Sequence, residues 1–357
     1  MSLDKLRGLN RLCSFAMQGA RLSSVKTGSV NSTWTENNKT YYQFTSGATL
    51  DLRVDVEQYY TKRNRNDKRI IGKVGKSVND YLVCAGGGGG GPQYPSGGNY
   101  GGGGGGGGGG LVVNTPQCPA PLRSPTTLSF VPGSFVVQQT IYNPFLDNGN
   151  GFVNADFTIT VGSGGGANAS GSPSSLAYPT AVKNAFSNPN LGTISATGGG
   201  TQSTPGGSGG GGQTWSASGG GSGVPGQGNN GGGGGGAAPS SSPGGQGGGG
   251  GGYTAVGGAG NYPSPVGNGG NGVSITLNGT PITFSGGGGG GGRSGIPGPP
   301  HGTSYPGRPN ASGGTGGGGG GASAPTSNSF GGGGGGYSTP SGGTQGSGAP
   351  GTIIIEL

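Results

Sequence analysis

The chain has 357 residues, of which 100 are glycine and 26 are proline, whereas only 27% are hydrophobic and 8% are charged. The absence of a Gly-X-Y period excludes a collagen triple helix, and the shortage of large apolar side chains excludes two or three globular domains with ordinary hydrophobic cores. The formal net charge is +8; 14 of the 18 basic and 7 of the 10 acidic residues precede residue 86, whereas every proline follows residue 85. The composition therefore divides the chain into residues 1–85 and a glycine-rich domain, 86–357.

The first residues of the chain carry an apolar side chain at every third position. These side chains belong to Leu3, Leu6, Leu9, Leu12 and Phe15, and basic residues lie between them. The spacing predicts an amphipathic docking helix or, as an alternative, an arginine-rich organelle-targeting peptide. The segment lacks the apolar core of a secretory signal, and no stretch of the chain is long and apolar enough to insert into a membrane.

Residues 31–84 have the pattern of β-structure. Strand-forming residues fill Thr40–Thr45, and apolar residues alternate with charged ones over Thr49–Val56, which predicts a half-buried strand. The basic stretch Lys62–Arg69 predicts a solvated hairpin tip; contact with nucleic acid is the alternative, which no second basic element supports. We expect residues 1–85 to form a small β-containing attachment module that needs a partner for stability.

Seven uninterrupted runs of six or more glycines dominate the rest of the chain, and five of them have six residues. They are 86–91, 101–110, 231–236, 247–252, 286–292, 316–321 and 331–336. Such a run suits either a solvated flexible chain or a polyproline-II-like helix that hydrogen-bonds to its neighbours. A repeated length favours side-by-side rods, because six residues at about 3.1 Å each give a common thickness of roughly 19 Å. Packed polyglycine-II helices are therefore the expected fold of residues 86–357, with disorder as the alternative.

Two apolar strands are predicted at the ends of the glycine-rich domain. Val78–Cys84 runs directly into the first glycine run, and Gly351–Leu357 contains three consecutive isoleucines. An exposed row of isoleucines would be an aggregation edge, so we expect the two strands to pair and close the domain on itself.

Two hairpins and one further strand are predicted as insertions. A β insertion is expected at about 111–161, with a Pro-Gly turn between 126–131 and 134–142 and an alternating strand at Phe152–Val161. A second hairpin is expected at Val273–Phe284, where Asn278 and Gly279 have the sequence of a two-residue turn. Pro281 should confine its strand to a sheet edge. The overall expectation is an irregular, all-β fold.

Residue types that carry catalysis are scarce. The chain has one histidine, His301, and three cysteines without metal-ligand spacing, and three acidic residues follow residue 85. Paired carboxylates, histidine clusters and a Ser-His-Asp triad are therefore not expected. Gly-X-Gly-X-X-Gly strings arise here from composition alone and lack a strand–helix context. We predict no enzymatic activity, no cofactor and no bound metal.

Aromatic residues lie in or beside the short segments that connect the glycine runs. The candidate receptor-binding residues are Tyr94, Tyr100, Trp215, Tyr262, Tyr305, Phe330 and Tyr337. On a rigid frame they could stack on sugars or cover a protein surface. The alternative for each of them is that it packs over the end of a glycine rod and shields backbone groups there.

The strand that enters a glycine run (YLVCAGGGGGG), the repeated runs and the terminal aliphatic strand (GTIIIEL) resemble the glycine-rich adhesins at the tips of T-even-type bacteriophage long tail fibres. The resemblance covers the architecture and composition of residues 78–357. It implies a polyglycine-II layer whose loops recognise the bacterial host surface. It also implies a virion protein made in the host cytoplasm. On this hypothesis we expect residues 1–85 to dock onto a fibre or baseplate protein.

Three functions therefore remain open at this point. The first is a phage adhesin that binds a bacterial outer-surface protein or glycan through its loops. The second is a purely architectural tail or fibre protein of the virion. The third is a disordered glycine-rich extracellular or interaction protein, in which the runs are solvated spacers.

Overall fold

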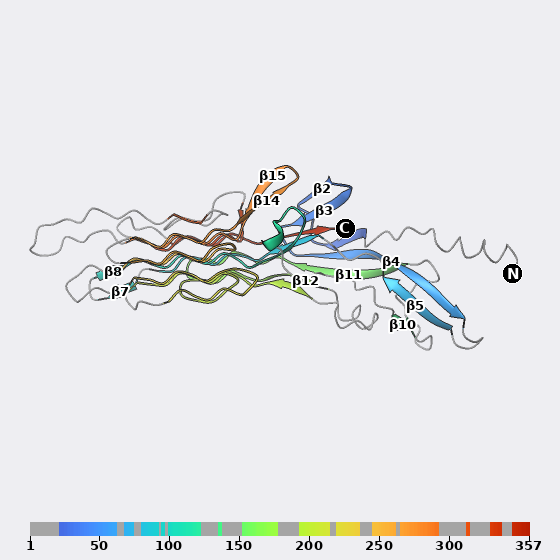
Figure 1. Cartoon of the computed structure of the whole chain (residues 1–357), viewed down its shortest axis with the longest axis horizontal. Coiled ribbons are helices and arrows are strands. Elements are labelled where there is room, and N and C mark those ends of the chain that lie inside the picture. The colour runs from blue at the N-terminus through green and yellow to red at the C-terminus, as the bar shows by residue number, and fades with distance from the viewer. Residues whose placement is uncertain are drawn as a thin grey trace, which may run out of the picture.

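The computed structural model describes residues 21–62, 68–74, 80–92, 94–96, 99–122, 135–137, 152–177, 193–214, 219–235, 245–261, 265–292, 312–314, 329–337 and 345–357. Over these ranges the chain consists of strands, turns and extended segments, with one short 3-10 turn, η1 (Ala120–Leu122), and no α-helix. The molecule is elongated, with most strands toward one end and a bundle of extended segments toward the other (Figure 1). The expected irregular, nearly all-β fold is confirmed. The apolar positions Leu3–Phe15 lie outside the described residues.

A five-stranded sheet joins the two ends of the glycine-rich domain. Its order is β2 (Ser32–Glu36), β3 (Lys39–Phe44), β17 (Thr352–Glu356), β6 (Tyr81–Cys84) and β9 (Leu111–Asn114). The central strand, β17, is antiparallel to both neighbours, and its Ile353 lies opposite Phe44 on one side and Val83 on the other. The predicted pairing of the C-terminal isoleucines with Val78–Cys84 is confirmed.

A second sheet contains strands from both sides of residue 85. Its path is β10 (Phe135–Val137), β5 (Lys68–Val74), β4 (Ala48–Lys62), β11 (Phe152–Thr160), β12 (Ser174–Ala177) and β13 (Ile194–Ala196), and β1 (Arg21–Thr27) also pairs with β4. The predicted strands at 49–56 and 152–161 correspond to β4 and β11, which pair with each other over eight residues. The division of the chain into two domains at residue 85 stays a prediction. The pairing of β4 with β11 joins residues from both sides of that boundary in one sheet. The expected partner of β10, residues 126–131, lies outside the described residues.

Two smaller sheets complete the β-structure. The hairpin of β14 (Val273–Leu277) and β15 (Thr280–Phe284) turns at Asn278 and Gly279, whose φ angles of 49° and 71° fit the two-residue turn that was predicted. The expectation of an edge strand at Pro281 is wrong, because β16 (Ser329–Phe330) pairs with the other side of β15. That pairing involves only Thr283 and Phe284, so it does not need the amide hydrogen that Pro281 lacks. A fourth sheet pairs β7 (Tyr94–Ser96) with β8 (Asn99–Gly101).

Both faces of the five-stranded sheet are covered by apolar side chains. On one face Phe44, Val83 and Ile353 pack with Leu50 and Phe157 of the β4–β11 sheet. On the other face Leu82 and Ile354 pack with Ile275 and Phe284 of the β14–β15 hairpin. Because side chains alternate along each strand, β17 contributes isoleucines to both clusters. The result is a three-layered β base.

Extended segments lie side by side beyond this base and form what we call the glycine layer. It comprises residues 85–92, 101–110, 162–172, 197–214, 219–235, 245–261, 265–272, 285–292, 312–314, 331–337 and 345–351. The base end of the layer is where β6, β9, β16 and β17 join it, and the far end carries the β7–β8 hairpin (Figure 1). Segments with serine, alanine and asparagine belong to the layer as well as the pure glycine runs.

Backbone hydrogen bonds connect the segments in a cycle of three residues. In the run 86–91, every third amide donates to the same neighbour: residues 86 and 89 donate to 172 and 169, residues 87 and 90 to 349 and 346, and residues 88 and 91 to 107 and 104. The N···O distances are 2.8 to 3.1 Å. Carbonyls of the same run accept from the amides of Gly165, Gly199 and Gly334. The run therefore has hydrogen-bonded neighbours on all sides.

The segments approach so closely that a side chain has no room between them. A Cβ added to Gly106 would lie 2.7 Å from the carbonyl carbon of Gly88 and 2.9 Å from the oxygen of Gly89. At the rim of the layer the situation differs, since a Cβ on Gly166 would meet no atom within 4 Å. Glycine is thus required inside the layer by close backbone approach.

Candidate functional site

The far end of the glycine layer brings together several of the aromatic residues predicted to bind a receptor. The amide of Tyr337 donates to the oxygen of Gly91 at 3.1 Å, and the amide of Gly103 donates to the oxygen of Tyr337 at 3.0 Å. The run ending at Tyr337 therefore lies beside the segments from which the β7–β8 hairpin projects. In that hairpin Tyr94 is paired with Gly101 and Tyr100 with Pro95. Tyr94, Tyr100 and Tyr337 thus belong to one end of the layer.

Three further predicted residues, Trp215, Tyr262 and Tyr305, lie outside the described residues.

Phe330 is placed apart from the other predicted residues. It lies in β16 at the base end of the layer, where its ring stacks on Phe284 with the centroids 6.1 Å apart. It is partly buried against the cluster that β14 and β15 form on the five-stranded sheet. Its position next to a glycine run suggested a loop residue, but the apolar contact with Phe284 holds it in the base.

Glutamine side chains form hydrogen bonds with the backbone at the ends of the extended segments, a role that was not predicted from the sequence. At the far end the Gln202 oxygen accepts from the amide of Gly104 at 3.1 Å, and its nitrogen donates to Gln213 at 2.7 Å. At the base end Gln227 accepts from the amide of Thr197 at 2.8 Å and donates to the oxygen of Ser195 at 3.2 Å. An amide side chain carries both a donor and an acceptor, so it can replace a missing neighbouring backbone. Gln213 directly follows four glycines, and this position in the sequence could have indicated its role at the end of an extended segment.

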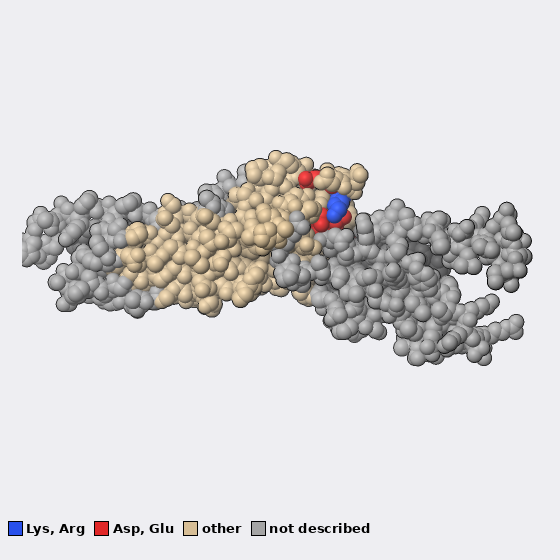
Figure 2. All heavy atoms as spheres, viewed as in Figure 1, with Lys and Arg blue, Asp and Glu red and all other residues tan. Residues whose placement is uncertain are grey.

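The described segments of the glycine layer contain no Lys, Arg, Asp, Glu or His. Charged side chains on the described surface gather instead over the base, as Figure 2 shows for one face. The described groups at the far end are therefore backbone groups, amides, hydroxyls and the Tyr337 ring. Such a surface can bind through shape, stacking and hydrogen bonds.

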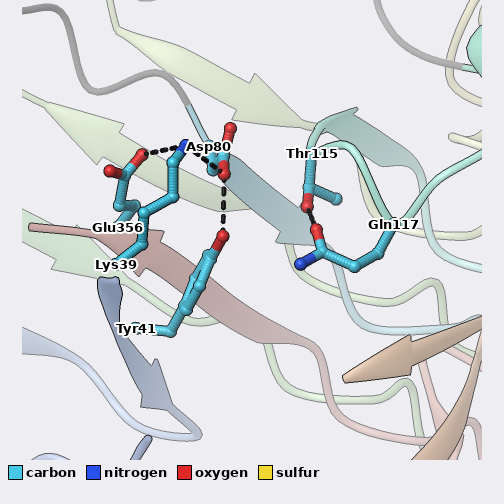
Figure 3. Close-up of polar contacts among 6 residues, drawn as sticks. All are labelled: Lys39, Tyr41, Asp80, Thr115, Gln117 and Glu356. Atoms are coloured by element: carbon cyan, nitrogen blue, oxygen red, sulfur yellow. Dashed lines mark hydrogen bonds and ion pairs between the residues drawn. The ribbon is translucent and has the colours of Figure 1, made fainter. Parts of the chain in front are cut away.

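A partly buried polar cluster lies at the end of the five-stranded sheet where β6 begins and β17 ends (Figure 3). Lys39 Nζ donates to Asp80 Oδ2 at 2.8 Å and to Glu356 Oε2 at 3.1 Å, and the Tyr41 hydroxyl donates to the same Asp80 oxygen at 2.8 Å. The Asp80 side chain is 7% exposed, so these donors replace the water that it has lost. The cluster fastens β3, β17 and the residue preceding β6 to one another.

Burial in the base also shifts several pKa values upward. Desolvation, with the hydrogen bond to Asp80, raises the pKa of Tyr41 to about 12, and desolvation alone raises that of Tyr81 to about 12. Burial likewise raises the pKa of the Cys84 thiol to about 12. Partial burial by itself lowers the pKa of Lys39, but the hydrogen bonds to Asp80 and Glu356 outweigh it, so the net shift is upward.

These shifts predict that the base loses stability in alkaline solution. A group with a raised pKa binds its proton more tightly in the folded state, so its contribution is complete below the unfolded pKa and is lost as the pH rises toward the folded value. For Cys84, Tyr41 and Tyr81 this window runs from about pH 9 to about pH 12. We expect the melting temperature to change little from neutral pH to pH 9 and then to fall steeply. Differential scanning calorimetry measures this, and Tyr41→Phe should flatten the part of the fall above pH 10; a steep fall already below pH 8 would contradict the prediction.

The two described cysteines, Cys84 and Cys118, are buried in the same apolar cluster and form no disulfide. The Cys84 sulfur lies 3.5 Å from the Ser285 hydroxyl, where β6 enters the glycine layer. Among the described residues no group of His, Cys, Asp and Glu could hold a metal ion. No helix in the described part of the chain is long and apolar enough to cross a membrane. His301 lies outside the described ranges, and the absence of enzymatic activity stays a prediction.

Comparison of the chain with protein-family models, curated proteins and solved structures found no match. The inference about function therefore depends on the residues and contacts of this chain. The arrangement to be explained is a hydrogen-bonded layer whose described segments carry no charged side chain, with Tyr94, Tyr100 and Tyr337 at one end and the β base at the other.

Proposed function

We propose that this protein is a phage virion adhesin that recognises a bacterial surface through the far end of its glycine layer. The observation that carries the proposal is the position of Tyr94, Tyr100 and Tyr337 at one end of the layer, opposite the β base. An adhesin needs this polarity, because one end must attach to the particle while the other meets the host. The resemblance to T-even-type tail-fibre adhesins, stated from the sequence, supports the same assignment.

We infer that the glycine layer is a bundle of packed polyglycine-II helices. That helix has three residues per turn and leaves its amides and carbonyls free for neighbours. A cycle of three residues in the hydrogen bonds of runs 86–91 and 247–252 supports this interpretation. In run 247–252, residues 247 and 250 donate to 291 and 288, residues 248 and 251 to 212 and 209, and residues 249 and 252 to 258 and 255.

The proposed mechanism is binding on a rigid frame without catalysis. Short loops between hydrogen-bonded rods lose little conformational freedom when they meet a ligand, so more of the contact energy remains for affinity. Tyrosine adds a large contact area with few rotatable bonds. Loops can also change in sequence while the backbone-bonded frame stays the same, which suits a receptor that varies between hosts.

Substitution of the far-end tyrosines tests the proposal. We expect the double variant Tyr94→Ala, Tyr337→Ala to bind bacterial cells at least about 30-fold more weakly than the wild type, the loss typical of aromatic hot spots. The measurement is the binding of fluorescently labelled protein to the strain that the wild-type protein binds, read by flow cytometry. The melting temperature should be unchanged.

Val256→Ala serves as the control, because Val256 is 63% exposed in a turn at the base end of the layer. It should bind cells as the wild type does. If the tyrosine variant bound cells normally while antibodies still located the protein on the fibres of phage particles, the protein would be an architectural virion component and the adhesin proposal would be wrong.

A further inference from the structure

We propose that Lys39 and Asp80 become joined by an isopeptide bond, an amide between their side chains, which forms within the folded chain with Glu356 as the general base and acid. The proposal goes beyond the proposed adhesin function and does not depend on it. It concerns the polar cluster of the five-stranded sheet, where an amine and a carboxyl group from different strands lie in contact (Figure 3). The bond would be a permanent clamp across the base.

The backbone brings the three side chains to one end of the sheet. Lys39 is the first residue of β3, Asp80 directly precedes β6, and Glu356 is the last residue of β17, which lies between those two strands. The amide of Glu356 donates to the Asp80 backbone oxygen at 3.0 Å. On the other side the amide of Leu357 donates to the Thr40 oxygen, also at 3.0 Å. The chain that carries the general base is thus hydrogen-bonded to the chain on both sides that carries the reactants.

The amine of Lys39 is held between two carboxylates. Its Nζ lies 2.8 Å from Asp80 Oδ2 and 3.1 Å from Glu356 Oε2. Asp80 Oδ2 also accepts from the Tyr41 hydroxyl at 2.8 Å. Asp80 is therefore the carboxyl group that the amine attacks, because a second donor already holds the oxygen that remains in the amide. Glu356 is the carboxylate left to carry protons.

The reaction needs no further reactant. Glu356 first accepts a proton from the Lys39 ammonium group, which frees the lone pair of the nitrogen. That lone pair forms a bond to the Asp80 carboxyl carbon, while a C–O bond of this group breaks. Of the three ammonium protons one stays on the amide nitrogen, and two leave with the departing oxygen as water. Glu356 returns its proton in that step and ends unchanged, while the Tyr41 hydroxyl stabilises negative charge on the oxygen that stays.

Burial and fixed geometry both favour the bond. The side chains of Asp80 and Glu356 are 7% and 13% exposed, and that of Lys39 is 30% exposed. Removal of opposite charges from water is costly, and the condensation replaces them by a neutral amide and releases one water molecule. Contact within the fold also replaces an encounter in solution, which corresponds to an effective concentration of about 10⁵ M or more when the groups are well oriented.

The bond would shorten the covalent path from the first strands to the glycine layer. Residues 40–79 separate Lys39 from Asp80 in the sequence, whereas the layer begins at residue 85. Because β3 and β6 lie on either side of β17, they are connected in the sheet only through its hydrogen bonds. A force between the β2–β3 hairpin and the layer would then pass through the amide instead of those hydrogen bonds.

Mass spectrometry of the purified full-length protein tests the bond. We expect the denatured wild-type chain to weigh less than its sequence by one water molecule. Trypsin should yield a branched peptide that joins residues 27–53, uncut at Lys39, to residues 77–123. A wild-type chain of full mass, or a loss of water without this branched peptide, would overturn the inference. A link from Lys39 to Glu356 in place of Asp80 would overturn it as well.

Two substitutions separate the chemistry from the fold. Lys39→Arg keeps the positive charge and the hydrogen-bond donors, but its guanidinium group stays protonated and is no nucleophile, so this variant should have the full mass. Glu356→Gln keeps the shape of the side chain and loses the group that accepts the proton. The linked fraction should fall at least about tenfold, since general acid–base catalysis contributes about 10²–10⁴ in rate. Complete linkage in a Glu356→Gln variant that melts cooperatively would overturn the assigned role of Glu356.

Lys26 and Asp156 provide a matched internal control. They form an ion pair of the same residue types, but their side chains are 44% and 46% exposed, so water surrounds both groups. The digest of the wild-type protein should contain no branched peptide that joins these two residues. Equal linkage of the two pairs would show that contact alone is sufficient and would overturn the role assigned to the cluster.

Discussion

Alanine in place of Gly106 should lower the free energy of unfolding by at least about 3 kcal/mol, the upper part of the range for overpacked interiors. Gly106 lies in a run that is hydrogen-bonded on all sides: its amide donates to Gly334 and its oxygen accepts from Gly288, both at 2.8 Å. The added methyl group would meet backbone atoms of Gly88 and Gly89, and these atoms, unlike a side chain, cannot make room by a change of rotamer. Relief therefore requires whole segments to separate and their hydrogen bonds to lengthen.

Chemical denaturation gives the change in stability, and amide hydrogen exchange shows where it occurs. In the wild type we expect slow exchange in the runs 86–91, 101–110 and 247–252. In Gly106→Ala the exchange should accelerate in these three runs and not in β3 or β17. Gly166→Ala is the control at an open rim position and should stay within about 0.5 kcal/mol of the wild type. Equal effects of the two substitutions, or fast exchange throughout the wild-type runs, would show that the segments are solvated spacers.

Removal of Thr352–Leu357 should abolish the native fold of the base. β17 is the central strand of the five-stranded sheet, and its Ile353, Ile354 and Ile355 are at most 3% exposed. Each buried isoleucine that is lost costs about 2–5 kcal/mol, so three of them reach the whole stability of an ordinary domain. The deletion also leaves β3 and β6 with unpaired edges that invite aggregation.

The truncated protein is expected in the insoluble fraction or, if it is soluble, to bind the dye 1-anilinonaphthalene-8-sulfonate and to melt without a cooperative transition. The single substitution Ile354→Ala gives a graded test and should cost about 2–5 kcal/mol in the free energy of unfolding. Val256→Ala removes two methyl groups from an exposed side chain and should change it by less than about 0.5 kcal/mol. A truncated protein with a wild-type melting curve would mean that β17 does not hold the sheet together.

Much of the β base was predictable because its signals are local and strong. Three consecutive isoleucines predict a strand that is buried on both faces and needs a hydrogen-bonded neighbour. Val78–Cys84 was predicted as the apolar strand at the other end of the glycine-rich domain, so it was the expected neighbour. The Asn278–Gly279 turn was equally clear, since few residues other than asparagine and glycine accept the two positive φ angles. The prediction that Pro281 lies in an edge strand was wrong. A proline excludes a second neighbouring strand only at its own position, and β16 pairs with β15 at Thr283 and Phe284 alone.

That glycine runs lie side by side could be predicted from the sequence, whereas the extent of the glycine layer could not. Segments such as 162–172 contain serine, alanine and asparagine, and their side chains can be accommodated only because these segments lie toward the rim, where one side is open. Rim and interior positions depend on which segments become neighbours, and identical glycine runs carry no information about that choice. The same limit explains Phe330: its chain position resembles that of Tyr337, and only the contact with Phe284 separates the two.

The place of β17 in the sheet also determines an order of events during synthesis. Residues 81–84 leave the ribosome early, but their neighbour at 352–356 follows only after the entire glycine layer has been translated. Until then β3 and β6 lack the strand that pairs between them, and the glycine layer lacks its last segment, residues 345–351. The five-stranded sheet of the base can therefore be completed only after most of the chain has emerged.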